Sequence, residues 1–151
     1  AMYPKKLDYV RKILALYDES KLYPLFTDQY LTLTNIHELS AALRKLLKKR
    51  TIGIFHVTSR NLYTPFALGN YLIWKARRKK NAVKPTSIDT FLHQPNAARR
   101  YMKFSGLKTE NTQKALNVRL YTWQDSVDAI VKAHKVRALK HSASSKPAAA
   151  G

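Results

Sequence analysis

The stretch TIGIFHVTSRNLYTPFAL, residues 51–68, joins two patterns that together indicate an α/β fold. Its first part, Thr51–Ser59, is short, apolar and rich in β-branched residues, as is typical of a buried strand. Its second part contains Thr64 and Pro65, where a hydroxyl can cap a helix and proline suits the first helical position. We therefore expect a buried strand followed by a helix that runs to about Lys79.

Helix signals lie on both sides of this stretch. Apolar residues at helical spacing predict a first helix that ends near residues 18–20. A second helix is expected to begin at Asn35, with Glu38 in a capping-box position. Thr122 and Asp125 form a similar box at the start of the last helix.

The remaining elements are shorter. Thr109 is a candidate cap for a helix over residues 110–116, and Asn117 suits the left-handed position that would end it. Runs at 22–26 and 83–88 suit short strands, but each contains proline and is expected at most at a sheet edge. The predicted fold class is a small α/β domain of about four to five helices with a few short strands.

The length and composition favour one folded domain with a tail. The chain has 151 residues, of which 45% are hydrophobic, an ordinary value for a globular protein. After Ala133 the sequence becomes basic and rich in small residues. We expect residues 1–133 to form the α/β domain and residues 134–151 to form a basic flexible tail or linker. No apolar run is long enough to predict a membrane-spanning helix.

Several kinds of chemistry find no support in the sequence. The chain has no cysteine, which excludes disulfides, zinc–thiolate sites and thiol nucleophiles. Its five histidines are scattered, so no metal site is expected, and His56 is expected to be a packed core residue. No nucleophile–base pair is visible, so no catalytic residue is assigned. With no secretory signal visible, we expect an intracellular, reducing location, in the cytoplasm, a virion or a ribonucleoprotein.

The charge is the most unusual property. Lys and Arg number 28 against nine Asp and Glu, giving a net charge of +19, and no acidic residue occurs from Leu39 to Ile88. Such a field attracts polyanions, although a basic surface can also serve only solubility. The candidate anion-binding residues are Arg77, Arg78, Lys79, Lys80, Arg99 and Arg100. Tyr101 and Phe104 are candidates for base or ligand stacking, or for simple packing.

Five segments in order resemble one known family. They are DQY (28–30), TNIHELSAA (34–42), GIFHV (53–57), YTPFA (63–67) and LKTENTQKALNVRLYTW (107–123). Together they are similar to the C-terminal, substrate-domain part of the dTDP-4-dehydrorhamnose reductase family, which are extended short-chain dehydrogenases/reductases. The resemblance implies an α/β substrate domain that closes over a nucleotide-sugar. It also implies that an arginine near positions 99 and 100 faces the diphosphate of that ligand.

The chain departs from the family both in the cofactor half and within the matching segments. The family has a G-x-x-G-x-x-G dinucleotide turn, whereas this chain has four glycines and no such turn. Tyr17 and Lys21 match the spelling of the catalytic Tyr-x-x-x-Lys pair but fall in the wrong place, so we interpret them as a coincidence. Within the matching segments, Lys108, Asn117 and Tyr121 stand where the family has Asp, Gly and Pro. No cofactor is therefore assigned, and catalysis by the isolated chain is not expected.

Three functional hypotheses remain. The first is a non-catalytic binding or scaffold domain with a basic surface for an anionic partner, such as a nucleotide-sugar diphosphate. This domain would act with a Rossmann half upstream in a longer chain or with a protein partner. The second is a nucleic-acid-binding module of a ribonucleoprotein or viral assembly, held mainly by phosphate contacts. The third is a fragment of an NADP-dependent reductase.

Overall fold

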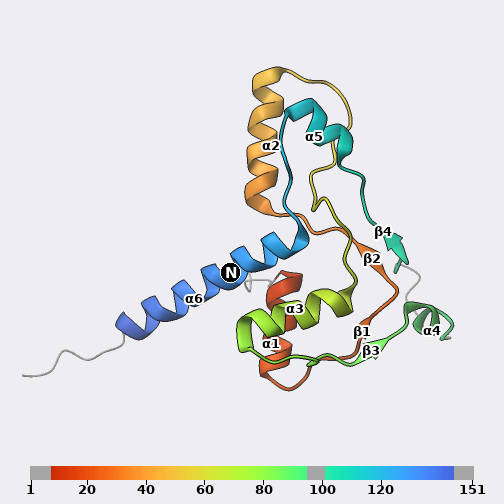
Figure 1. The fold of residues 1–151 in the computed structure, drawn as a ribbon, viewed down its shortest axis with the longest axis vertical. Helices are drawn as coiled ribbons and strands as arrows, with labels where there is room; N and C mark the ends of the chain where they lie inside the picture. The colour runs from red at the N-terminus through yellow and green to blue at the C-terminus, as the bar shows by residue number, and fades with distance from the viewer. Residues whose placement is uncertain (1–7, 95–100, 145–151) are drawn as a thin grey trace, which may run out of the picture.

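The computed structural model describes residues 8–94 and 101–144 of the chain (Figure 1). Helices dominate this part, and four two-residue strands lie between them. The elements in order are α1 (Tyr9–Asp18), β1 (Leu25–Phe26), β2 (Tyr30–Leu31), α2 (Ile36–Lys49), α3 (Pro65–Arg77), β3 (Pro85–Thr86), α4 (Ile88–Leu92), β4 (Phe104–Ser105), α5 (Glu110–Leu116) and α6 (Trp123–Ser144). The small α/β fold expected from the sequence is confirmed.

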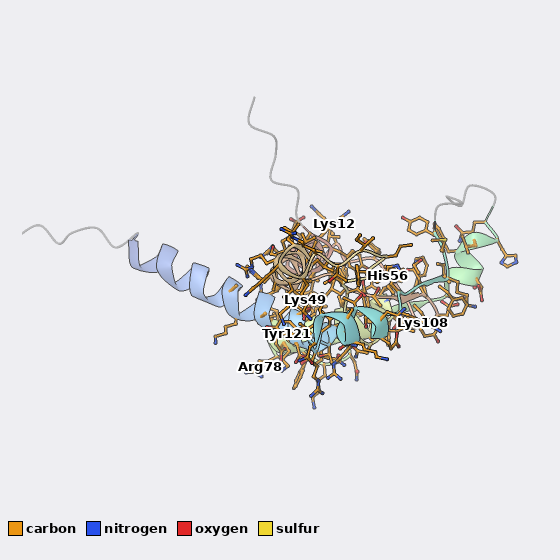
Figure 2. All side chains as sticks on the ribbon, turned by 90° about the horizontal axis from the view of Figure 1, so that it is seen from above. Lys12, Lys49, His56, Arg78, Lys108 and Tyr121 are labelled. Atoms are coloured by element: carbon orange, nitrogen blue, oxygen red, sulfur yellow. The ribbon has the colours of Figure 1, made fainter. Side chains whose placement is uncertain are left out.

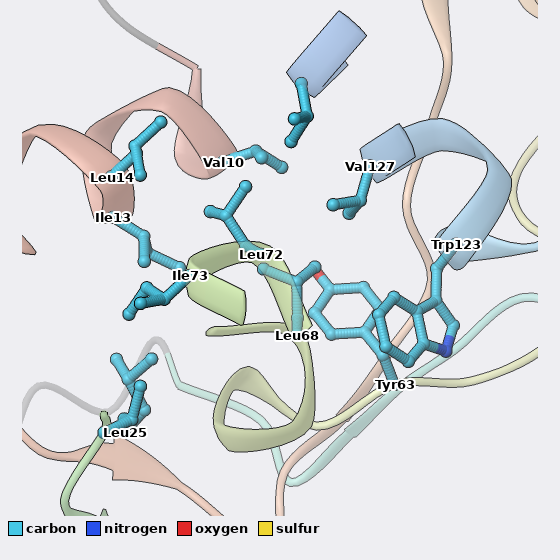
Figure 3. Packing of buried hydrophobic residues seen from close by; sticks show 12 residues of the cluster. Val10, Ile13, Leu14, Leu25, Tyr63, Leu68, Leu72, Ile73, Trp123 and Val127 are labelled. Atoms are coloured by element: carbon cyan, nitrogen blue, oxygen red, sulfur yellow. The ribbon is translucent and has the colours of Figure 1, made fainter. Parts of the chain in front are cut away.

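The main core forms around α3, which packs against both α1 and α6. Leu68, Leu72 and Ile73 of this helix are completely buried. Figure 3 shows them between the apolar side chains of α1 and the rings of Tyr63 and Trp123, whose centroids are 6.2 Å apart. Helix α3 has apolar residues on more than one face because it packs against neighbours on two sides.

A second, smaller core lies under α2. Ala42 of this helix packs with Val57, Leu116 and Leu120, and Figure 1 shows α2 and α5 together at one end of the molecule. The carboxylate of Glu38 accepts a hydrogen bond from the backbone N–H of Tyr121 at 2.6 Å, which ties α2 to the segment that leads into α6. Glu38, which the sequence placed in a capping box, therefore makes a long-range contact instead.

The strands form two separate parallel pairs. Leu25 and Phe26 of β1 pair with Pro85 and Thr86 of β3, and β2 pairs with β4. Each sheet has only two strands, so the proline in β3 lies at an edge, as its missing N–H requires. The expected strands at 22–26 and 83–88 are thus present in shortened form.

The prediction of a buried strand at Thr51–Ser59 is wrong. The structure assigns no strand to this segment, and the side chains of Ile52 and Ile54 are 98% and 86% exposed. Only its end, from Val57 to Ser59, is buried. A strand needs a hydrogen-bonded neighbour, and none of the described residues pairs with residues 52–58 through the backbone.

Helix boundaries match the sequence more closely. Thr64 Oγ1 accepts from Ala67 N–H at 3.2 Å, and Thr122 and Asp125 exchange the two hydrogen bonds of a capping box. Asn117 ends α5 with φ of 48°, whereas the Thr109 side chain makes no capping bond. The last helix continues to Ser144, beyond the composition change at Ala133. The division into a domain and a flexible tail stays a prediction, but helix α6 crosses the boundary drawn for it.

Candidate functional site

A cavity of about 740 Å³ lies among the described residues. It lies where α1, β1, the start of α3 and α4 meet, and Tyr101 also lines it. Six aromatic side chains line it: Tyr9, Tyr23, Phe26, Tyr63, Phe91 and Tyr101. Its walls are therefore flat rings delivered by segments that are far apart in the sequence.

Three of these rings support one another. Phe26 and Phe91 have centroids 5.6 Å apart, and Tyr101 lies edge-on to both, at 6.4 Å from Phe26 and 5.5 Å from Phe91. Tilted and edge-to-face arrangements at these distances are favourable for aromatic pairs. One wall of the cavity is therefore held in place without a ligand.

The dipeptide Asp28-Gln29 organises this wall. The carboxylate of Asp28 accepts hydrogen bonds from the Ser87 hydroxyl and the Ile88 N–H, both at 2.7 Å, and so fixes the start of α4, which carries Phe91. Burial alone would raise the pKa of Asp28, but these hydrogen bonds lower it below its ordinary value. Gln29 is 7% exposed and donates from Nε2 to the Met102 carbonyl at 3.0 Å, which positions the segment after Tyr101.

The cavity lining includes the neutral hydroxyl groups of Tyr9 and Tyr63 and the cationic side chain of Lys12. Burial raises the pKa of Tyr63 to about 12, and burial is also the main cause that raises the pKa of Tyr9. Both hydroxyls are therefore protonated at neutral pH and can donate hydrogen bonds. Lys12 lies at the lining of the cavity and is exposed to solvent. The arrangement can stack a flat ring, hydrogen-bond polar substituents and balance a negative charge.

Sequence reasoning identified only Tyr101 among these six rings. The other five come from four separate stretches, and no spacing rule connects them. The DQY motif at residues 28–30 was the available signal, because Asp28 and Gln29 both support the aromatic wall. Its role depends on contacts with residues about 60 to 73 positions away.

The predicted anion-binding residues do not converge on the cavity. Arg77 is engaged in an ion pair with Asp18, while Arg78, Lys79 and Lys80 are exposed at the end of α3 and do not line the cavity. Arg99 and Arg100 lie outside the described residues. In Figure 2, the labelled Lys12 and Arg78 lie on different sides of the body. The basic charge is therefore spread over the surface.

The two predicted stacking residues have different surroundings. Tyr101 is part of the aromatic wall. Phe104 lies outside the cavity, where its ring stacks on Tyr30 with centroids 5.4 Å apart and an angle of 4° between the planes. The Phe104 side chain is 70% exposed, so its outer face is open to solvent.

Other candidate chemistry finds little support in the described part of the chain. No group of three or more His, Asp or Glu side chains there could hold a metal ion. His56 is half-buried, with Nδ1 3.1 Å from the carbonyl oxygen of Lys108. The Lys21 ammonium pairs with Glu19 at 3.1 Å, while Tyr17 packs against the main core. None of the helices described here is both long and apolar enough to cross a bilayer.

Gly69 has a packing role within the main body of the fold. Gly69 lies inside α3, where a Cβ atom would come within 2.5 Å of Leu25 Cδ1 and 3.3 Å of Val83 Cγ2. This glycine permits close packing of a helix on β1, whereas a phosphate cradle needs glycines at a turn that opens a helix.

Comparison with known proteins places these features in a family. Residues 2–136 match the family model described as the RmlD substrate binding domain. Among curated proteins, no significant sequence match was found. The similar solved structures are considerably longer than this chain.

Three of these structures are dTDP-4-dehydrorhamnose reductases. The one from Bacillus anthracis, in complex with NADP, is 19% identical with a TM-score of 0.69, over 83% of this chain and 43% of that one. The one from Clostridium acetobutylicum is 18% identical with a TM-score of 0.72, and the match covers 88% of this chain and 46% of that one. The one from Yersinia enterocolitica is 17% identical with a TM-score of 0.68, and the match covers 85% of this chain and 44% of that one. The chain thus spans less than half the length of each, and the likeness shows a shared fold.

Proposed function

Because this chain belongs to the RmlD substrate binding domain family, we propose that it binds a nucleotide-linked sugar in the aromatic cavity. The single observation that carries this proposal is the cavity of about 740 Å³ with six aromatic rings in its wall. A volume of this size is in the range of cavities that hold small ligands and cofactors. The reductases with a similar fold act on a dTDP-linked sugar, according to their names.

Each part of such a ligand finds a suitable group. The pyrimidine ring can stack against the wall of Phe26, Phe91 and Tyr101, since base–aromatic stacking tolerates any flat ring. Sugar hydroxyls can accept hydrogen bonds from the protonated hydroxyls of Tyr9 and Tyr63. The diphosphate can lie toward Lys12, within the positive field that a net charge of +19 creates.

The role proposed for this chain is binding, not hydride transfer. In a reductase the nicotinamide cofactor supplies the hydride chemistry, and the protein positions the reacting groups. The given sequence contains no G-x-x-G-x-x-G run of the kind that holds dinucleotide phosphates. The chain would hold the nucleotide-sugar, and any reduction would need a cofactor-binding domain in addition.

A calorimetric titration with dTDP-rhamnose tests this function. We expect saturable binding of one ligand per chain, and binding of dTMP alone with lower affinity. Phe91→Ala should weaken binding about tenfold, because one stacked ring contributes about 1–3 kcal/mol. Phe104→Ala is the matched control, since it removes an aromatic ring outside the cavity. Binding that is absent, or that responds equally to both variants, would contradict the proposal.

One observation favours a second candidate, the binding of single-stranded nucleic acid. The ring of Phe104 is 70% exposed and already stacked on Tyr30, which offers an open platform for a base on a strongly basic chain. Titration with a 12-mer oligonucleotide at low and moderate salt tests it. For this candidate, Phe104→Ala and not Phe91→Ala should weaken binding, and the affinity should fall steeply with salt.

A further inference from the structure

The last helix of the chain continues beyond the core that it helps to form. Val127 and Val131 of α6 are buried in the main core, whereas Lys132 is exposed. From there the helix continues to Ser144, and residues 133–144 span about 18 Å at the rise of an α-helix. Figures 1 and 2 both show this outer part of α6 leaving the body of the molecule.

Helices α3 and α6 run in the same general direction, so they end on the same side of the molecule. The rings of Tyr63, just before α3, and Trp123, at the start of α6, have centroids 6.2 Å apart. Further along the two helices, Lys75 Nζ lies 3.0 Å from Asp128 Oδ2. Figure 1 shows α6 continuing past the end of α3.

Just beyond the contact between Lys75 and Asp128, each helix carries exposed cations. They are Arg78, Lys79, Lys80 and Lys132. The described structure shows no ion pair for these four residues. Two carboxylates at this end, those of Asp18 and Asp128, are instead bonded to Arg77 and Lys75. The charge of the four cations is therefore not neutralised by an ion pair within the described chain.

The outer part of α6 has the same sign of charge. Its sequence contains Lys135, Arg137 and Lys140, and no acidic residue follows Asp128 in the given sequence. We call the four exposed cations together with residues 133–144 the basic end of the molecule. Cations gathered at one end without acidic neighbours create a positive field that attracts polyanions.

The form of the basic end selects among polyanions. The major groove of B-form DNA is wide enough to admit an α-helix, so it can receive a helix that stands away from its domain. The major groove of an RNA duplex is too narrow for side chains to read. A membrane surface would need a helix with an apolar face, whereas Val136 and Leu139 are the only large apolar residues in the sequence from 134 to 144.

We propose that the basic end binds the backbone of double-stranded DNA, with the outer part of α6 in the major groove and Arg78, Lys79 and Lys80 against neighbouring phosphates. Contacts of this kind position a protein on a duplex without reading its sequence. The four described cations do not line the aromatic cavity, so the proposal does not rest on nucleotide-sugar binding. It also differs from the single-strand candidate, because Figure 1 shows β4, which carries Phe104, on the opposite side from the outer part of α6.

Fluorescence anisotropy of a labelled duplex of about 20 base pairs tests the proposal on the intact chain. We expect saturable binding at about 50 mM salt and a steep loss of affinity as salt increases, because phosphate contacts release counterions. Two variants, R78Q/K79Q/K80Q and K135Q/R137Q/K140Q, each remove one arginine and two lysines from the basic end. Each should weaken binding at least about tenfold and reduce the slope of log affinity against log salt by about 2–3.

A matched variant separates this surface from overall charge. R44Q/K45Q/K48Q also removes one arginine and two lysines, all exposed on α2, which Figure 1 shows at another end of the molecule. It should change the affinity less than about threefold, because its cations lie outside the proposed contact. Circular dichroism and thermal unfolding check that all three variants keep the fold. An equal loss of affinity in all three would overturn the proposal.

Other results would also overturn the choice of double-stranded DNA. Absence of saturable binding at low salt removes the proposal altogether. A single strand or an RNA duplex of the same length that binds as tightly as the DNA duplex assigns the basic end to nucleic acid of another form. Equal displacement of the DNA by polyglutamate, or equal binding to vesicles of phosphatidylserine and phosphatidylcholine, assigns it to an acidic protein or to a membrane surface.

Discussion

Arg77 and Asp18 form a two-pronged ion pair that joins the ends of α3 and α1. Arg77 Nε lies 2.8 Å from Asp18 Oδ1, and Nη2 lies 2.6 Å from Oδ2. Hydrogen bonding to Asp18 is the main cause that raises the pKa of Arg77, so the guanidinium stays charged throughout. A residue that the charge pattern assigned to an external anion is therefore paired within the fold.

Disruption of this pair should cost a small amount of stability. The two side chains are 35% and 41% exposed, so we expect Arg77→Gln to lower the free energy of unfolding by about 0.5–1 kcal/mol. That corresponds to a decrease in Tm of about 1–4 °C. Thermal unfolding at low and high salt measures the effect, which should shrink as salt increases. Arg78→Gln is the control, because the described structure shows no ion pair for Arg78. An equal loss in the two variants would show that the pair contributes nothing.

Two glycines should respond differently to alanine. At Gly69 the added methyl would come within 2.5 Å of Leu25 Cδ1 and 3.3 Å of Val83 Cγ2, and both of these side chains are buried in the core. We expect Gly69→Ala to cost about 1–3 kcal/mol, an overpacking effect that outweighs the better helix propensity of alanine. At Gly106 the methyl would meet Leu62, which is 51% exposed and can rotate away.

Gly106→Ala should therefore change stability by no more than about 0.5 kcal/mol. Urea unfolding of both variants measures the difference. A neutral Gly69→Ala would mean that the contact between α3 and β1 is looser than the structure shows.

The buried hydroxyl of Tyr63 predicts a loss of stability at alkaline pH. Burial raises its folded-state pKa to about 12, from an ordinary value of 10.0 that applies to the unfolded chain. The folded state therefore keeps a proton that the unfolded state loses, and stability falls as pH rises from about 10 to 12. Two pKa units correspond to about 2.7 kcal/mol once both states are deprotonated, and to about 2 kcal/mol at pH 11.5.

Tyr63→Phe isolates this contribution. Urea unfolding at pH 9 and pH 11.5 should show that the wild-type chain loses about 2 kcal/mol more than the variant. The comparison removes the effects of lysines and other tyrosines, which titrate in both chains. An identical pH dependence would mean that the Tyr63 hydroxyl is solvated in the folded state.

The rim cation of the cavity should contribute to ligand affinity through charge alone. We expect Lys12→Gln to weaken dTDP-rhamnose binding about three- to tenfold at low salt, and less at 0.5 M salt, because the side chain is exposed. Lys132→Gln removes an equal charge from α6, away from the cavity lining, and should have little effect. Titration calorimetry at two salt concentrations measures both variants. A matching decrease in both would assign the effect to overall charge.

The helical part of the fold was largely predictable, whereas the candidate site was not. Thr64 with Pro65 placed the start of α3, and Thr122 with Asp125 placed the start of α6. The strand predicted at Thr51–Ser59 was wrong because its pattern describes a strand with a neighbour, and the described residues provide none. The sequence did not assign five of the six aromatic residues to the cavity. Four of these five lie in or beside elements that the sequence predicted, but no local pattern shows that they surround one cavity.

The physical reason lies in the range of the interactions. Helix caps and helix ends depend on hydrogen bonds between residues about three positions apart, so the sequence alone determined Thr64, Asn117 and Thr122 as boundaries. The family resemblance likewise followed from the order of local motifs and is confirmed by the match over residues 2–136. The tertiary structure alone decided that Arg77 pairs with Asp18 and that six rings line one cavity, because those contacts join residues that are far apart in the sequence.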